Sequence, residues 1–133
     1  MPVTSVAQLA GAYAQAAREI NEATSAAHAA WDSSKQTLAD AKRMAKAYAT
    51  ADLAFIRAVQ AIPWYGDYKA LARKVLTADN LQYVSHRAAM AATTWGALKA
   101  KRSEAESANA EASVAANELR IALGLPPVPL SGR

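Results

Sequence analysis

Few residues in this chain could do chemistry, and their spacing argues against a catalytic or metal site. His28 and His86 are the only histidines, and the chain has no cysteine to act as a thiolate ligand. No Glu-x-x-His pair of the kind that holds a di-metal site in helical bundles occurs. Ser85 precedes His86, but adjacent residues on a helix point apart. We therefore expect no enzyme activity, no cofactor and no bound metal, with both histidines partly exposed at the surface.

Charge is the second chemical feature, because it is distributed unevenly along the chain. Residues 35–102 contain twelve Lys and Arg but four Asp, a net charge of +8, whereas each flanking segment carries −2. Cations spaced by four and seven residues suit contacts with phosphates that do not read bases. The candidate nucleic-acid-binding residues are Lys35, Lys42, Arg43, Lys46, Lys69, Arg73 and Lys74. Two alternatives stay open: a solvated surface of mixed charge, and a basic surface that meets the acidic end of another subunit.

The composition indicates a helical chain with a thin core. Alanine, the strongest helix former, supplies 36 of the 133 residues, whereas Leu, Ile, Val and Phe together number 23. A net charge of +4 and only five Gly and five Pro fit a disordered chain poorly. The helices must then pack closely through alanine, or part of the burial must come from other subunits.

Apolar residues recur every seven positions through the first half of the chain, as in a coiled coil. The repeat runs through Val6, Tyr13, Ile20, Ala27, Ser34, Ala41, Tyr48, Phe55 and Ile62, and mostly alanine follows three residues after each. Ser34 and Thr37 are the only polar residues on this seam. A repeat of this length predicts one long helix with a continuous seam against another helix. A second seam is expected through Val84, Ala88, Ala91, Trp95, Leu98, Arg102, Ala105, Asn109, Ala112, Ala116, Leu119 and Leu123.

The expected fold is all-α: an elongated antiparallel helical hairpin with Ala-rich heptad seams. Its arms would cover about residues 5–62 and 67–123, with a corner at 63–66 where Pro63 ends the first arm. Residues 1–125 would form a single domain, and residues 126–133 would be an extended Pro-rich tail.

Local signals set the ends of these arms and the pairing between them. Ser5 and Gln8 form a capping box at the start of the first arm, and Gly124 is a helix stop of the Schellman type. Folding the chain about residue 64 sets Trp31 level with Trp95, and this layer is expected to be the most sensitive site of the core, because most other seam positions are alanine.

An alternative fold divides the first arm. Asp32-Ser33-Ser34 is a poor helical sequence, and Ser33 with Gln36 is a second capping-box pattern. Helices at 5–31, 34–62 and 67–123 would then form a three-helix bundle with a break near Asp32–Ser34. We favour the unbroken arm, because the seven-residue phase crosses this point and no Gly or Pro intervenes.

Alanine also flanks the seams on the outer helix faces, which predicts a further neighbour and therefore a homo-oligomer. The tail contains three prolines between Leu125 and Leu130, so it would lose little entropy on docking. We expect it to lie against an adjacent subunit, with Val128 and Leu130 as the oligomer contacts.

The corner sequence Trp64-Tyr65-Gly66 resembles the W-x-G turn of the small secreted WXG100 helical hairpins. The resemblance covers these three residues and the hairpin arrangement, and it implies a secreted helical partner protein. The expected arms are longer than in that family, and no tyrosine-acidic secretion signal follows the second helix. The aromatic residues from Trp64 to Tyr68 are expected to close the end of the core; contact with a membrane surface or with bases is the alternative.

The features together predict a non-enzymatic structural or assembly protein of a multi-subunit complex. The favoured context is a bacteriophage virion, as an internal, ejection or connector protein with its basic half facing DNA. The alternatives are a free nucleic-acid-binding helical protein and a WXG100-like secreted hairpin. The expected location is the virion or the cytoplasm, because the chain contains no run of 18 apolar residues and no signal-peptide pattern.

Overall fold

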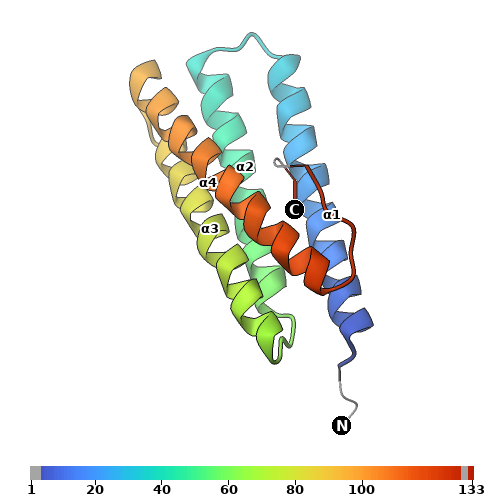
Figure 1. Cartoon of the computed structure of the whole chain (residues 1–133). Helices are drawn as coiled ribbons and strands as arrows, with labels where there is room; N and C mark the ends of the chain where they lie inside the picture. Colours follow the sequence, from blue (N-terminus) through green and yellow to red (C-terminus); the bar gives the residue numbers. More distant parts are fainter. Residues whose placement is uncertain (1–3, 130–131) are drawn as a thin grey trace.

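In a computed structural model that describes residues 4–129 and 132–133, four α-helices follow one another and pack as a bundle (Figure 1). They are α1 (Val6–Asp32), α2 (Leu38–Gln60), α3 (Asp67–Met90) and α4 (Trp95–Ala122). Each helix packs against the next one along the chain. The expected two-helix hairpin is therefore wrong, because each of its arms folds back on itself.

The first expected arm is divided where the two polar residues of its seam lie. The Ser34 hydroxyl donates to the carbonyl of Trp31 at 2.7 Å, just past the end of α1. The Thr37 hydroxyl then accepts from the amide of Asp40 at 3.2 Å, while the Asp40 carboxylate accepts from the Thr37 amide at 3.1 Å. This capping box starts α2. The alternative fold located this break correctly, but its three-helix bundle missed a second one.

That second break separates α3 from α4 at residues 91–94. The Thr94 hydroxyl accepts from the amide of Ala97 at 3.2 Å and caps α4. No Gly or Pro lies in this turn, and Gly96 is inside the helix that follows. The only local signal for the break is the cap-forming pair Thr93-Thr94, which the seven-residue repeat outweighed in the prediction.

The two strongest local signals are confirmed. Ser5 and Gln8 form the predicted capping box at the start of α1. Gly124 has a φ of 77°, and the amide of Leu125 donates to the carbonyl of Arg120 at 2.8 Å, the 6→1 bond of a Schellman motif. These signals act over six residues or fewer, so they hold whatever the rest of the chain does.

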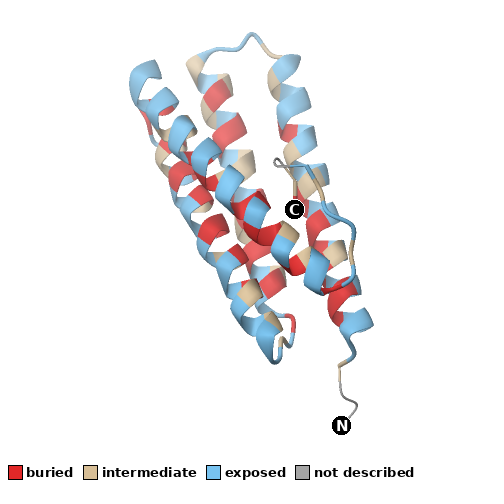
Figure 2. Cartoon of the chain, in the orientation of Figure 1, coloured by how far each residue is buried: buried red, intermediate tan, exposed pale blue. Residues whose placement is uncertain are grey.

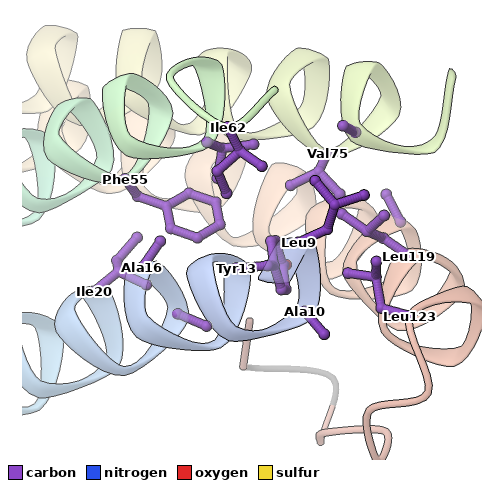
Figure 3. Packing of buried hydrophobic residues seen from close by; sticks show 14 of the residues in the cluster. Leu9, Ala10, Tyr13, Ala16, Ile20, Phe55, Ile62, Val75, Leu119 and Leu123 are labelled. Carbon is purple, nitrogen blue, oxygen red and sulfur yellow. The ribbon is translucent and has the colours of Figure 1, made fainter. Parts of the chain in front are cut away.

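Most apolar burial lies at one end of the bundle, where all four helices contribute (Figure 3). The ring of Tyr13 lies 6.0 Å from that of Phe55 and 6.4 Å from that of Trp64, both edge to face. The Trp64 indole donates to the carbonyl of Val59 at 2.9 Å. Trp64 and Tyr68 pack on this cluster, as expected for residues that close the end of a core.

A smaller cluster lies toward the opposite end and is made mainly of alanine. Its buried members are Ala41, Ala45, Ala89, Ala92 and Leu98, with half-buried Trp31 beside them. Trp95 is 39% exposed and the ammonium of Lys99 lies 5.9 Å from its ring centroid, so the expected Trp31–Trp95 core layer is wrong. Figure 2 shows few buried positions on the second half of α1, which lies toward this end of the bundle; Ala27 is the only buried residue of the helix after Ile20.

The segment after Gly124 folds back beside α1 and has no helix or strand among its described residues (Figure 1). The Asn117 side chain pairs with the main chain of Val128, donating at 3.0 Å and accepting at 2.8 Å.

Within the described residues, no helix is both long enough and apolar enough to span a bilayer.

The aromatic cluster should dominate stability. Phe55→Ala should lower the free energy of unfolding by about 3–5 kcal/mol, because it removes a fully buried ring that contacts Tyr13. Trp95→Ala should cost clearly less, about 1 kcal/mol, because that ring is 39% exposed and belongs to neither apolar cluster. Urea denaturation of both variants checks the pair, and a larger loss for Trp95→Ala would contradict the described packing.

Candidate ligand-binding cleft

One face of α3 carries polar residues into the bundle interior. Asp79, Gln82 and His86 are separated by three and four residues, so they lie on one helical face, and all three are buried. The same face continues to Val75 toward the start of α3 and to Ala89 toward its end. Val75 belongs to the larger apolar cluster and Ala89 to the smaller one. A polar layer therefore separates the two parts of the core.

The predicted second seam is mostly buried on α4, where Trp95 is the exception, but it is wrong on α3. On α4, Leu98, Ala105, Ala112 and Leu119 are buried as expected. On α3, Val84 is 54% exposed, because the polar residues occupy the inward face instead. The prediction assumed that apolar residues turn inward, and this assumption fails where polar partners from other helices are available.

The upper part of the polar layer is a buried pair between α2 and α3. Nδ1 of His86 lies 2.8 Å from Oδ2 of Asp52, so the ring donates to the carboxylate. Asp52 is 1% exposed and His86 is 8% exposed, and the ring of Tyr48 lies 5.1 Å from the imidazole. The expected surface position of His86 is therefore wrong, whereas His28 is exposed and lies 3.4 Å from Asp32.

The two remaining atoms of this pair differ in access. Oδ1 of Asp52 is enclosed and has no hydrogen-bond partner among the described residues. Nε2 of His86 has none there either, but it is not among the enclosed unpaired atoms, and His86 lines an open cleft. A carboxylate that orients an imidazole, with the second ring nitrogen accessible, is an arrangement that can accept or donate a proton or hydrogen-bond a ligand.

The lower part of the polar layer holds Arg133, which the tail brings into the bundle. Its Nε donates to Oδ1 of Asp79 at 2.8 Å, and the two side chains are 3% and 0% exposed. Its guanidinium also donates to Gln82 and, at 3.3 Å, to the hydroxyl of Ser113. The hydroxyl of Tyr13 donates to the main-chain oxygen of Arg133 at 3.2 Å. Burial raises the pKa of Asp79 to about 6, although the guanidinium of Arg133 acts in the opposite direction.

A cleft of about 730 Å³ lies above these groups, between α1 and α4. α2 and α3 form its floor, where Asp52, Gln82 and His86 lie next to apolar Met44, Ala45 and Ala89. Arg133 also lines the cleft. So do Arg102 on α4 and Trp31 on α1, and the guanidinium of Arg102 lies 5.5 Å from the ring centroid of Trp31.

The structure separates the predicted nucleic-acid-binding residues into two groups. Lys35 lies in the loop before α2, and Lys42, Arg43 and Lys46 lie in the first half of α2, whereas Lys69, Arg73 and Lys74 lie in the first half of α3. α2 and α3 are antiparallel neighbours, so the two groups are at opposite ends of the bundle (Figure 1). Arg43 is paired with Asp40, and Lys74 lies 3.4 Å from Glu118. The expected basic half is therefore not one surface.

A different set of cations shares one end of the bundle. The α1–α2 loop and the α3–α4 turn lie at the same end, and they place residues 25–46 near residues 87–104 (Figure 1). These two segments carry eight Lys and Arg against three acidic residues, a net charge of +5. The cations are Lys35, Lys42, Arg43, Lys46, Arg87, Lys99, Lys101 and Arg102.

The predicted oligomer contacts lie in the tail. Val128 is half-buried and its main chain pairs with Asn117 of the same chain, as described above. Leu130 lies outside the described residues. A contact between either residue and another subunit stays a prediction.

Comparison with protein-family models, curated proteins and solved structures finds no match to this chain. Within residues 4–129 and 132–133, no group of three or more His, Asp or Glu side chains is arranged to hold a metal ion. The case for a site therefore depends on the geometry of the cleft. The cleft was not predicted from the sequence. The only local signal for it is the spacing of Asp79, Gln82 and His86, which places them on one helical face.

The buried carboxyl of Asp79 should leave a signature in the pH dependence of stability. Its pKa of about 6 lies above the unfolded value of about 3.9, so the folded chain holds a proton that the unfolded chain releases between these pH values. This group therefore contributes about 2–3 kcal/mol of stability below about pH 4, which is lost as the pH rises through about 6.

Urea unfolding of the wild type and of Asp79→Asn from pH 4 to pH 7 checks this sign. The difference between the two free energies should shift in favour of the variant as the pH rises. Asp40→Asn is the control, because the hydrogen bonds from Thr37 lower the pKa of that half-buried carboxyl, so its titration lies below most of this window. A pH-independent difference for Asp79→Asn would contradict the raised pKa.

Proposed function

We propose that this protein binds a small organic ligand in the cleft between α1 and α4. The observation that carries the proposal is the Asp52–His86 pair, which is buried in the floor and leaves one ring nitrogen accessible from the cleft. A polar group in this position costs free energy unless a ligand or water hydrogen-bonds it. A fixed imidazole can therefore orient a ligand that its apolar surroundings retain.

The size and lining of the cleft support this function. Binding sites for small molecules usually occupy about 300–1,000 Å³ and combine apolar walls with a few polar groups. Met44, Ala45 and Leu98 supply apolar surface next to Gln82 and His86. Alanine leaves room between the helices that a larger side chain would fill.

A blocking substitution tests whether the cleft is the binding site. Ala29 is exposed on α1 and lines the cleft, so Ala29→Trp should fill part of it without altering the core. Titration of the wild type with 1-naphthylmethanol should shift amide resonances of cleft residues in ¹⁵N–¹H correlation spectra. In Ala29→Trp the affinity should fall at least about tenfold, the equivalent of about 1.4 kcal/mol.

Ala26→Trp is the matched control, because Ala26 is an exposed alanine of the same helix that does not line the cleft. It should leave the affinity unchanged. Equal loss in both variants, or shifts scattered over the surface of the wild type, would reject the cleft as the site.

A second candidate function is polyanion binding at the end of the bundle where the α1–α2 loop and the α3–α4 turn lie. We call it the basic end, because the two turns bring eight cations together there. Exposed cations release counterions from a phosphate backbone, so the affinity for duplex DNA should fall with salt by about 0.9 logarithmic units per contact. The role expected from the sequence, a non-enzymatic assembly protein of a phage virion, stays a proposal that such binding would support.

Charge reversal at the two ends separates this candidate from non-specific attraction. Lys35→Glu with Lys46→Glu should weaken DNA binding and reduce its salt dependence. Lys69→Glu with Arg73→Glu changes the net charge equally at the opposite end and should have the smaller effect. Fluorescence anisotropy with labelled duplex at several salt concentrations measures both. Equal losses would show that total charge, and not the basic end, determines binding.

A further inference from the structure

Resting on the proposed function, we infer that the ligand of the cleft is an organic cation: a protonated amine carried on a flat apolar group. The inference depends on which charges line the cleft and on which atom of the Asp52–His86 pair is accessible. The accessible atom is the one on which the proposed function also rests, whereas the charges of the lining are a separate observation.

The charges that line the cleft favour a cation. Arg133 is neutralised by its ion pair with Asp79. The other charged residues of the lining are Asp32 on α1, Asp52 on α2, and Arg102 and Glu106 on α4, which leaves a net charge of −2 when both histidines are neutral. The eight cations of the basic end do not change this balance inside the cleft, because Arg102 is the only one among its lining residues.

The accessible atom of the buried pair favours a donor. When the ring is neutral, donation from Nδ1 of His86 to the Asp52 carboxylate leaves a lone pair on Nε2. An ammonium group can donate to this lone pair, and the Asp52 charge behind the ring would stabilise it. A carboxylate or phosphate would meet a lone pair and a second negative charge. The geometry therefore discriminates by ligand charge as well as by hydrogen bonding.

The arrangement also places apolar surface where the rest of such a ligand would lie. Met44, Ala45, Ala89 and Leu98 line the same cleft as His86, and Ala45, Ala89 and Leu98 belong to one apolar cluster. Arg102 covers a face of Trp31 at the upper end, so that ring is already occupied by a cation. A ligand ring would accordingly contact the aliphatic floor, with its ammonium group directed at His86.

Three probes that share one ring system test the charge preference. They are 1-naphthylmethylamine, which is protonated near neutral pH, 1-naphthylmethanol, which is neutral, and 1-naphthoate, which is an anion. Titrations of the intact chain, followed by ¹⁵N–¹H spectra at pH 7.5, should give the amine an affinity at least about tenfold above that of the alcohol. The naphthoate should bind more weakly than the alcohol.

Two variants place this preference in the cleft. Glu106→Gln and Asp32→Asn remove exposed carboxyls that line it and should each lower the affinity for the amine about threefold, with no change for the alcohol. Glu111→Gln is the control, because Glu111 is an exposed carboxyl of the same helix outside the cleft. It should leave both affinities unchanged.

The outcomes separate the inference from the function on which it rests. Tightest binding of the amine, weakened by the two cleft variants alone, supports the inference. Binding of the alcohol or the naphthoate at the cleft with equal or higher affinity than the amine overturns the cation preference and leaves the binding function standing. If none of the three probes shifts the resonances of cleft residues, both proposals are overturned.

Discussion

Two carboxylates inside the bundle constrain much of the rest of the structure. Removing an ion from water costs several kcal/mol even in a relaxed protein interior, so Asp52 and Asp79 need partners at short range. Asp52 has His86 on the adjacent helix, 2.8 Å away. Asp79 has Arg133, which is 54 residues further along the chain. The path of the tail after Gly124 follows from this second requirement, because the guanidinium reaches Asp79 only if the chain folds back over the bundle.

The same polar layer explains why the core is divided and why a cleft exists. Below the layer, Tyr13, Phe55 and Trp64 fill the space between helices with aromatic rings. Above it, the buried residues are mainly alanine, which has too little volume to join α1 to α4. The outer helices therefore diverge at that end, and the polar groups of the layer become the floor of an open cleft.

The division of the chain into four helices has a related cause. A seam of alanine buries little apolar surface per residue, so a long hairpin would gain only a small hydrophobic stabilisation along its length. Breaks at residues 33–37 and 91–94 allow Tyr13, Phe55, Val75 and Leu119 to contact one cluster. The caps at Thr37 and Thr94 satisfy the amide groups that the breaks expose. The seven-residue phase continues across the first break, which is why periodicity alone did not reveal it.

The sequence by itself determined the helical character of the chain, the cap at Ser5, the stop at Gly124 and the inward face of α4. These features arise from propensity, from hydrogen bonds within a few residues and from a stripe of small apolar side chains, so distant parts of the chain do not alter them. Only the tertiary structure decided that α3 turns Asp79, Gln82 and His86 inward and that residues 35–46 lie beside residues 87–102. A polar residue can be buried only where a partner is present. The partner of His86 is Asp52, 34 residues away, and the partner of Asp79 is Arg133, 54 residues away.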